Sequence, residues 1–461
     1  MAIERLKTGN TNLDEVLHGG FPVNTINVVM GAPGSGKTIL AEQLVFANAT
    51  AEAPALYFTT LSEPLDKFIQ HGQTYAFFDS SKVGEAVSYE DLGLMVRERG
   101  IGALTEIITE MIIARRPRLI IIDSFKALNE LFENQQERRT ILFDLASVLS
   151  AYRCTTFLIG EYAGDMMTEL PEFAISDSIL LLLKHSTGVR EQRFLRVEKL
   201  RGSASSPGMH AFNISEKGID LFPRLVTPPI SPHYTSAIQR VNTGVTGLDE
   251  MIETGFWRGS TTLVAGPTGA GKTIIGLHFI REGVGNNEPG VYVGFQENPV
   301  QLSRTMRNFN WDPEQLLKTG SFELMYRSPV EMQLDSVAAE LLARVREGRI
   351  KRVVIDAIGD LKKSGADSQR FSDFMYAMTQ WFATENVTCM LLYETQKLFE
   401  VTRISDEEIS NMSDNIVLLS FTRGAEMARK VRILKTRGSA HDHREHTLEI
   451  TETGVTVKKF S

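Results

Sequence analysis

A short phosphate-binding pattern occurs twice in this chain of 461 residues, near the start of each of two similar halves. Both copies, residues 31–38 and 266–273, match G-x-x-x-x-G-K-[ST], in which glycines let backbone N–H groups wrap a phosphate. Each copy lies between two apolar segments, so a helix that begins at the loop is predicted to direct its dipole at the same anion. The pair predicts two phosphate-binding domains of the α/β class.

In such loops the lysine reaches the β- and γ-phosphates of a nucleotide, and the hydroxyl that follows it holds Mg²⁺. The pattern therefore predicts ATP and Mg²⁺ as ligands, with Lys37 and Lys272 also acting in catalysis. The loop residues predicted to contact the nucleotide are Gly34, Ser35, Gly36, Lys37, Thr38 and Ile39 in the first half, and Gly269, Ala270, Gly271, Lys272, Thr273 and Ile274 in the second.

Two near-continuous apolar segments, 119–122 and 353–355, each end in a carboxylate, Asp123 and Asp356. Segments of this kind are typical of parallel strands that are buried on both faces. An aspartate at the carboxyl end of such a strand can hold the hydration shell of Mg²⁺ near the loop threonine. We therefore predict Thr38, Asp123, Thr273 and Asp356 as the metal-site residues; the alternative for each aspartate is a buried, hydrogen-bonded structural role.

The two halves match from end to end, which indicates a duplicated domain. An Arg-x-x-Thr-Gly segment opens each half, and a Lys-x-Arg-Gly-Ser segment lies near the end of each. Strand and helix patterns alternate between them and end in β-rich segments, which predicts a doubly wound α/β domain with a β extension, made twice. We expect the domains at 1–225 and 240–461, joined by a proline-rich linker at 226–239.

The Lys-x-Arg segments place Lys199 with Arg201, and Lys435 with Arg437, on one face of a strand. A solvated strand face is the usual interpretation of such a pair. Its recurrence beside two phosphate-binding loops instead favours contact with a phosphate or with charge that develops on it. If the segments lie far from their own loops, they would act across a subunit interface, as arginine fingers do.

Hydrolysis also needs a group that positions or deprotonates water. After the strand that follows each loop helix, the first half offers Glu63 and the second offers Gln296 and Glu297. One strand later lies another pair, Glu161 and Glu394. The sequence leaves open whether these carboxylates act as bases or are structural.

The bulk composition is that of an ordinary globular chain, with 42% hydrophobic residues and a net charge of −8. That charge argues against a protein that coats nucleic acid. The chain also has a few short clusters of lysine and arginine, which are predicted to be solvated helix ends or strand starts. Cys154 and Cys389 each open an apolar strand and are predicted to be reduced. No signal peptide or membrane-spanning run is recognisable, so we expect a cytoplasmic protein without membrane association.

These residues together resemble the KaiC family of RecA/DnaB-like P-loop ATPases over nearly the whole chain. The shared motifs are the Thr-Gly…Leu-Asp-Glu entry, both loops, both strand-end aspartates and both Lys-x-Arg-Gly segments. The resemblance implies two tandem RecA-like P-loop NTPase domains, each a mostly parallel sheet flanked by helices with a β extension. It also implies slow ATP hydrolysis in the first domain and Ser/Thr autokinase activity in the second, used in regulation.

Family members form double-ring homohexamers with ATP in the clefts between subunits. By resemblance, the residues that would reach a neighbouring subunit's nucleotide are Lys199, Leu200, Arg201, Lys435, Thr436, Arg437 and His441. A KaiB-like or other signalling protein would be the partner, and nucleic acid would not be one.

The chain departs from the family pattern at four places. The paired glutamates of the family are replaced by Leu61-Ser62 in the first half, while Gln296 takes the place of the base in the second. Of the adjacent Ser-Thr phosphorylation pair only Ser410 is kept, because Asn411 follows it. The chain stops just past its last predicted strand, so we expect no counterpart of the family's C-terminal tail.

These departures predict a KaiC homologue outside the standard oscillator. Two alternatives stay open: a nucleotide-gated regulatory scaffold with little turnover, and a RecA/DnaB-like DNA-dependent ATPase.

Overall fold

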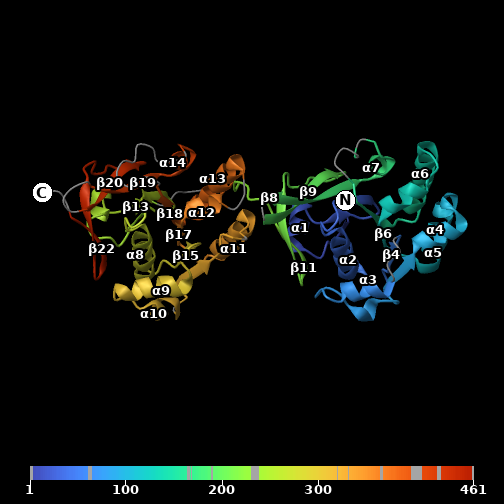
Figure 1. Ribbon diagram of the computed structural model, residues 1–461, viewed down its shortest axis with the longest axis horizontal. Coiled ribbons are helices and arrows are strands. Elements are labelled where there is room, and N and C mark those ends of the chain that lie inside the picture. Colours follow the sequence, from blue (N-terminus) through green and yellow to red (C-terminus); the bar gives the residue numbers. More distant parts are fainter. Residues whose placement is uncertain are drawn as a thin grey trace. The chain divides into compact units, whose positions relative to one another are not determined.

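The chain folds as two compact units, Met1–Arg224 and Leu225–Ser461 (Figure 1). The computed structural model describes residues 4–60, 65–162, 167, 169–187, 190–229, 238–318, 320–330, 332–363, 367–395, 407–422 and 427–458. Most of the predicted linker, including residues 230–237, lies outside these ranges.

The described part of the first unit is built on a nine-stranded sheet in the order β11-β10-β9-β8-β3-β7-β6-β4-β5. The strands from β8 to β5 pair in parallel, and β9, β10 and β11 add antiparallel pairs. Their bounds are β3 (Ile26–Gly31), β4 (Ala55–Thr59), β5 (Val87–Asp91), β6 (Leu119–Asp123), β7 (Thr155–Gly160), β8 (Ser178–Thr187), β9 (Arg190–Leu200), β10 (His210–Ser215) and β11 (Gly218–Phe222), with a separate small pair β1 (Arg5–Leu6) and β2 (Phe21–Pro22).

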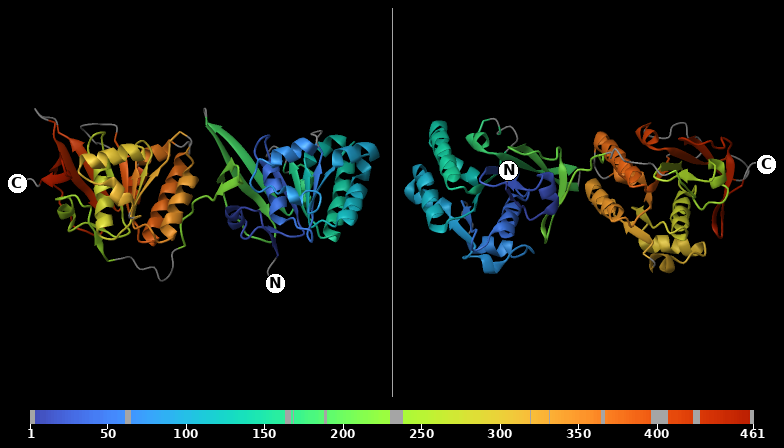
Figure 2. Two further views of the ribbon diagram at one scale, coloured as in Figure 1. Left: turned by 90° about the horizontal axis from the view of Figure 1, so that it is seen from below. Right: turned by 180° about the vertical axis from the view of Figure 1, so that it is seen from behind.

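Helices cover both faces of this sheet (Figure 1 and Figure 2). Leu40 of α2 packs with Val29 on one face, while Ile108 of α5 and Leu145 of α6 pack with Val28 on the other. The helices are α1 (Thr11–Val16), α2 (Lys37–Asn48), α3 (Leu65–Gly72), α4 (Leu92–Arg99), α5 (Leu104–Arg115), α6 (Gln135–Ala151) and α7 (Pro171–Ile175), with a 3₁₀ segment η3 (Phe125–Leu131) after β6.

The second unit repeats this order strand for strand as β22-β21-β20-β19-β14-β18-β17-β15-β16. Its strands are β14 (Thr261–Gly266), β15 (Gly290–Gly294), β16 (Phe322–Tyr326), β17 (Arg352–Asp356), β18 (Thr388–Glu394), β19 (Asn415–Phe421), β20 (Arg429–Thr436), β21 (His446–Thr451) and β22 (Gly454–Lys458), with the pair β12 (Arg240–Val241) and β13 (Phe256–Trp257). Its helices are α8 (Lys272–Gly285), α9 (Pro299–Asn308), α10 (Pro313–Lys318), α11 (Leu334–Arg346), α12 (Ile358–Lys362), α13 (Ser368–Thr384) and α14 (Glu407–Met412).

The apolar central strands explain why the sheets are covered on both sides. In β6, Leu119 and Ile121 pack into the cluster on one face, and Ile120 and Ile122 pack into the cluster on the other. Because successive side chains of a strand point to opposite faces, a continuous apolar run needs helices above and below it. The predicted fold class, two tandem α/β domains with β extensions, is confirmed. Among the described residues, no helix combines the length and apolarity needed to span a bilayer.

Candidate nucleotide sites

The first phosphate-binding loop lies between β3 and α2, and it begins the helix through a glycine. Gly36 caps α2 with a φ of 99°, and Gly271 caps α8 with a φ of 102°. Side chains with a Cβ rarely adopt this left-handed conformation, so glycine allows the sharp turn from loop into helix. The turn leaves the first N–H groups of each helix pointing at the loop, which suits an anion.

The loop lysines are buried, and their ammonium groups are hydrogen-bonded to backbone carbonyls of their own loops. The Lys37 ammonium is 8% exposed, and it donates to the carbonyl oxygens of Gly31 at 3.1 Å and Ala32 at 2.9 Å. Lys272 makes the same pair of bonds, to Gly266 at 2.8 Å and Pro267 at 2.9 Å. Each positive charge is therefore fixed at the floor of its pocket.

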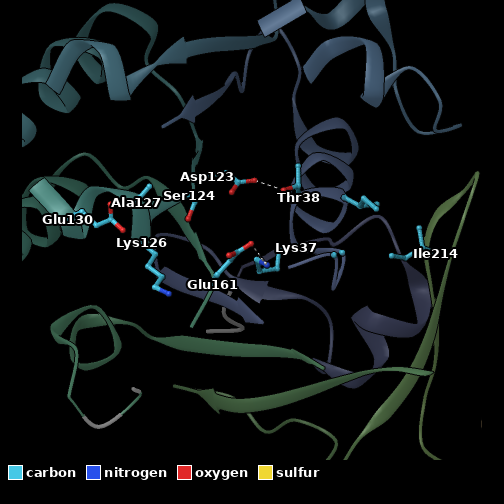
Figure 3. Close-up of a pocket in the computed structure, with 12 residues that line it drawn as sticks. Lys37, Thr38, Asp123, Ser124, Lys126, Ala127, Glu130, Glu161 and Ile214 are labelled. Atoms are coloured by element: carbon cyan, nitrogen blue, oxygen red, sulfur yellow. Dashed lines mark hydrogen bonds and ion pairs between the residues drawn. The ribbon is translucent and has the colours of Figure 1, made fainter. Parts of the chain in front are cut away.

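A pocket of about 440 Å³ opens above the first loop (Figure 3). It is lined by Gly34, Gly36, Lys37, Thr38, Ile39, Asp123, Ser124, Lys126, Ala127, Glu130, Glu161 and Ile214. The second loop faces a pocket of about 340 Å³. That pocket is lined by Thr268, Gly269, Gly271, Lys272, Thr273, Ile274, Tyr292, Gly294, Gln296, Glu297, Leu302, Thr305, Asp356, Ala357, Glu394 and Ile450. Most of the predicted loop residues line these pockets; Ser35 and Ala270 are buried beneath them.

Each predicted metal pair is brought together by the fold. Thr38 Oγ1 donates to Asp123 Oδ2 at 2.7 Å, and Thr273 Oγ1 donates to Asp356 Oδ2 at 2.8 Å. Figure 3 shows Thr38 and Asp123 pointing toward each other from α2 and β6. A tyrosine from the neighbouring strand donates to the same carboxylate oxygen in each half, Tyr57 at 3.0 Å and Tyr292 at 2.5 Å.

These tyrosines were not predicted from the sequence, although they occupy matching positions in the two halves. The recurrence of tyrosine at one position of both repeats, in the strand after each loop helix, was the signal that could have revealed them.

These oxygens fit a magnesium ion. Mg²⁺ prefers hard oxygen ligands and is usually held by one or two carboxylates together with phosphate oxygens and water. In each half a hydroxyl and a carboxylate face the pocket, and the described residues contain no cluster of three or more His, Cys, Asp or Glu side chains suited to a metal. That donor set suits a metal shared with a phosphate ligand rather than one caged by protein alone.

Burial shifts the protonation of the first site. It lowers the pKa of Lys37, an effect that the carboxylates of Glu161 and Asp123 oppose. It raises the pKa of Asp123, while hydrogen bonds from Thr38 and Tyr57 act in the opposite direction. Both shifts arise because charge is poorly solvated here. In such an environment a phosphate that neutralises Lys37 interacts more strongly than it would in water.

The candidate water-activating groups fall into two sets. Glu161 lies 3.9 Å from the Lys37 ammonium, and Glu394 accepts a hydrogen bond from Thr268 at 2.5 Å, so both lie beside the loops. Gln296 and Glu297 also line the second pocket, where the Gln296 amide donates to Asp360 at 2.8 Å. Burial and the nearby Asp356 raise the pKa of Glu297. Glu63 lies outside the described residues.

The Lys-x-Arg segments lie away from their own loops. Neither the lysine nor the arginine of either segment is among the described residues that line the pockets. Lys199 donates to the Phe173 carbonyl at 3.2 Å, and Arg201 lies 3.7 Å from Asp177. Leu200 ends the same strand, β9.

In the second half, Lys435 donates to the carbonyl oxygens of Ser410 at 3.0 Å and Ser413 at 2.7 Å. Arg437 donates to the Asn411 carbonyl at 3.0 Å and lies 3.5 Å from Asp414. These bonds tie Ser410 of α14 to the Lys-x-Arg segment.

Thr436, the residue between Lys435 and Arg437, bonds to the ring of His441. Thr436 Oγ1 and His441 Nδ1 are 2.9 Å apart, and His441 Nε2 is buried without a hydrogen-bond partner among the described residues. The predicted contact of Thr436 and His441 with a nucleotide stays a prediction.

Comparison with known proteins identifies the family. The family model described as "ATPase: KaiC" matches residues 6–226 and 241–460. The chain belongs to the KaiC family of ATPases. Among curated relatives, the circadian clock oscillator protein KaiC of Rippkaea orientalis is 28% identical, over 99% of this chain and 89% of the relative. The KaiC of Synechococcus elongatus is 27% identical over the same shares. The predicted family and an ATPase activity are thereby confirmed.

One buried carboxyl in this KaiC-family chain has no counterpart in its second half. Glu42 of α2 is 3% exposed, and its Oε1 has no hydrogen-bond partner among the described residues. Burial, with a smaller effect of the nearby Asp123, raises the pKa of Glu42 to about 8. Leu277 takes the matching place on α8, five residues after Lys272.

Replacing Glu42 with leucine is expected to stabilise the protein, and more so at high pH. The native state keeps the Glu42 proton up to about pH 8, whereas a glutamate in the unfolded chain releases it near the ordinary pKa of 4.5. The native chain therefore binds more protons between these values, and stability falls as the pH rises through that window. Because the leucine variant lacks this loss, its gain at pH 9 should reach a few kcal/mol.

Thermal unfolding at pH 6 and pH 9 measures this effect. Glu98→Gln, which changes an exposed carboxylate of α4, is the control and should shift the melting temperature little at either pH. An equal shift for Glu42→Leu at both pH values would contradict a raised pKa.

Proposed function

We propose that this ATPase binds ATP with Mg²⁺ in both pockets and works as a homohexamer, with each nucleotide held between neighbouring subunits. One observation carries the proposal. Two Lys-x-Arg segments that suit phosphate recognition, the first at Lys199 and Arg201 and the second at Lys435 and Arg437, lie outside the pockets of their own halves. In a ring, the segment of one subunit would serve the pocket of the next.

Different residues of the chain have distinct roles in the first pocket. Lys37 holds the β- and γ-phosphates, while Thr38 and Asp123 direct their oxygens at the metal position. Bound Mg²⁺ supplies charge neutralisation at the phosphate oxygens. Glu161 orients the attacking water and accepts its proton, and Arg201 of the adjacent subunit stabilises the charge that develops on the transferred phosphoryl group.

The second pocket would turn over more slowly. Gln296 stands where the base is expected, and an amide orients water but does not accept its proton. Its side chain is also engaged with Asp360. We assign the base role there to Glu297, because a raised pKa brings a carboxylate closer to the working pH of a general base.

We further propose that the second domain autophosphorylates on Ser410. The support is the link between α14 and the Lys-x-Arg segment: Lys435 contacts the Ser410 carbonyl, and Arg437 contacts that of Asn411. If Arg437 reaches a neighbour's ATP, Ser410 is carried to the same interface. The output would be regulatory, in the cytoplasm, through a KaiB-like or other signalling partner that senses the nucleotide state.

Light scattering coupled to size exclusion, with and without ATP and Mg²⁺, tests the assembly, and intact-mass measurement of the ATP-treated sample tests the kinase activity. We expect a nucleotide-dependent hexamer that gains one phosphate per chain, and Ser410→Ala should abolish the gain. A hexamer without added mass would favour a nucleotide-gated scaffold. A monomer indifferent to ATP would refute the proposed action across subunits.

A DNA-dependent ATPase is the remaining alternative. Hydrolysis measured with and without single-stranded DNA separates it from the proposal, which expects no stimulation.

A further inference from the structure

The first pocket contains a second ammonium group, Lys126, and the described residues that line the second pocket include no equivalent of it. Lys126 lies on η3, three residues after the strand-end Asp123, and its side chain lines the pocket together with Lys37 and Glu161 (Figure 3). At the same distance past Asp356, the second half has Gly359 on α12. The two sites therefore differ by a full positive charge at one matching position.

Lys126 is held much less firmly than Lys37. Lys37 is fixed by two loop carbonyls, whereas no described residue accepts a hydrogen bond from Lys126 or forms an ion pair with it. The ring of Tyr162 lies beside it, with its centroid 5.9 Å from the ammonium. A half-buried ammonium whose donors have no acceptor among the described residues, on a flexible four-carbon stem, is suited to close on an anionic ligand.

Two like charges share this pocket. The positive charge of Lys126 adds to the effect of burial in lowering the pKa of Lys37. The carboxylates of Glu161 and Asp123 oppose that effect, and an anion bound between the two ammonium groups would relieve the repulsion that remains between them. The loop lysine already reaches the β- and γ-phosphates from the floor of the pocket, so the second ammonium is suited to the free oxygens at the end of the phosphate chain, where a triphosphate carries more charge than a diphosphate.

We propose that Lys126 binds the terminal phosphate of ATP from within the same subunit, and that it makes the first pocket, but not the second, discriminate ATP from ADP. The inference rests on the assignment of the first pocket as an ATP site. One charge-assisted contact is worth roughly 10- to 100-fold in affinity, and the diphosphate would not make it.

The two halves offer a reciprocal experiment. Lys126→Met keeps the apolar stem and removes the charge. Gly359→Lys adds the charge to the second pocket, and the position tolerates it: α12 is helical there, and no atom lies within 4 Å of the added Cβ. Full-length chains with Lys272→Ala report on the first pocket, and chains with Lys37→Ala report on the second.

Equilibrium dialysis with ATP and with ADP, each with Mg²⁺, gives the affinity ratio of each pocket. We expect Lys126→Met to reduce the ATP preference of the first pocket by about 10- to 100-fold while ADP affinity changes little, with partial recovery in Lys126→Arg. Gly359→Lys should raise the ATP preference of the second pocket.

An unchanged ratio in Lys126→Met, in a variant with wild-type thermal stability, would overturn the proposal and leave the ATP site intact. If the chain with Lys272→Ala alone bound neither nucleotide, the assignment of the first pocket would fail, and this inference with it.

Discussion

A chain with Lys37→Ala is expected to bind one ATP instead of two, and Lys272→Ala should lose the other. Each lysine supplies a buried ammonium at the floor of its pocket, fixed by two loop carbonyls. A charge-assisted contact with phosphate is worth about 1.5–3 kcal/mol, and a P-loop lysine can make more than one. We therefore expect affinity at the mutated site to fall by roughly 10²- to 10⁴-fold.

Equilibrium binding of ATP with Mg²⁺ gives the stoichiometry. The single variants should each keep one site, and the double variant should keep none. Lys82→Ala is a control, because this lysine donates to the Phe46 carbonyl outside the pocket and leaves both sites intact. Full ATP binding in both single variants would mean that the loops are not the nucleotide sites.

Arg201→Ala is expected to slow hydrolysis in the first pocket about 10³-fold or more while leaving ATP binding largely intact. The guanidinium is more than half exposed and lies 3.7 Å from Asp177, a separation at which an ion pair contributes little. It is therefore available to a ligand on a neighbouring subunit. Arg196→Ala is the matched control: it removes an arginine of β9, the strand that ends directly before Arg201, and this arginine is already paired with Glu198.

Mixed oligomers decide whether this arginine acts on a neighbour. Both kinds of subunit carry Lys272→Ala. Subunits that also carry Lys37→Ala keep Arg201 but bind no nucleotide. Subunits that also carry Arg201→Ala bind ATP in the first pocket but lack the arginine. An oligomer made of only one kind of subunit should not hydrolyse ATP in the first pocket. If the arginine acts across subunits, mixing them restores hydrolysis at the interfaces where one supplies ATP and the other supplies Arg201. A mixture as inactive as its parts would show that the arginine acts within its own chain, or not at all.

The sequence predicted the parts of this protein that are local and repeated. A phosphate-binding loop has a fixed length because its backbone must wrap an anion, so its lysine and threonine can be located without a fold. Asp123 and Asp356 could be assigned because parallel strands end at one edge of a sheet, the edge that also carries the loops. Thr38 and Asp123 then meet at 2.7 Å, although β7 separates β3 from β6.

Contacts from outside these patterns could not be predicted in the same way. Tyr57 lies within an apolar strand, and nothing in the spacing along the chain shows that its hydroxyl reaches Asp123 from the adjacent strand. Glu42 reads as an ordinary polar position in a helix and is in fact buried. The side-chain environment of such residues depends on which elements pack against them.

The sequence by itself determined the duplication, the two α/β domains and the identity of the loop and strand-end residues, because each rests on spacing along the chain. Only the tertiary structure decided which other side chains share a pocket. It placed Lys126 and Glu161 beside Lys37, and it placed Arg201 and Arg437 away from the loops of their own halves. The physical reason is that charge and burial act through space, so residues distant in the chain set the chemistry of each site.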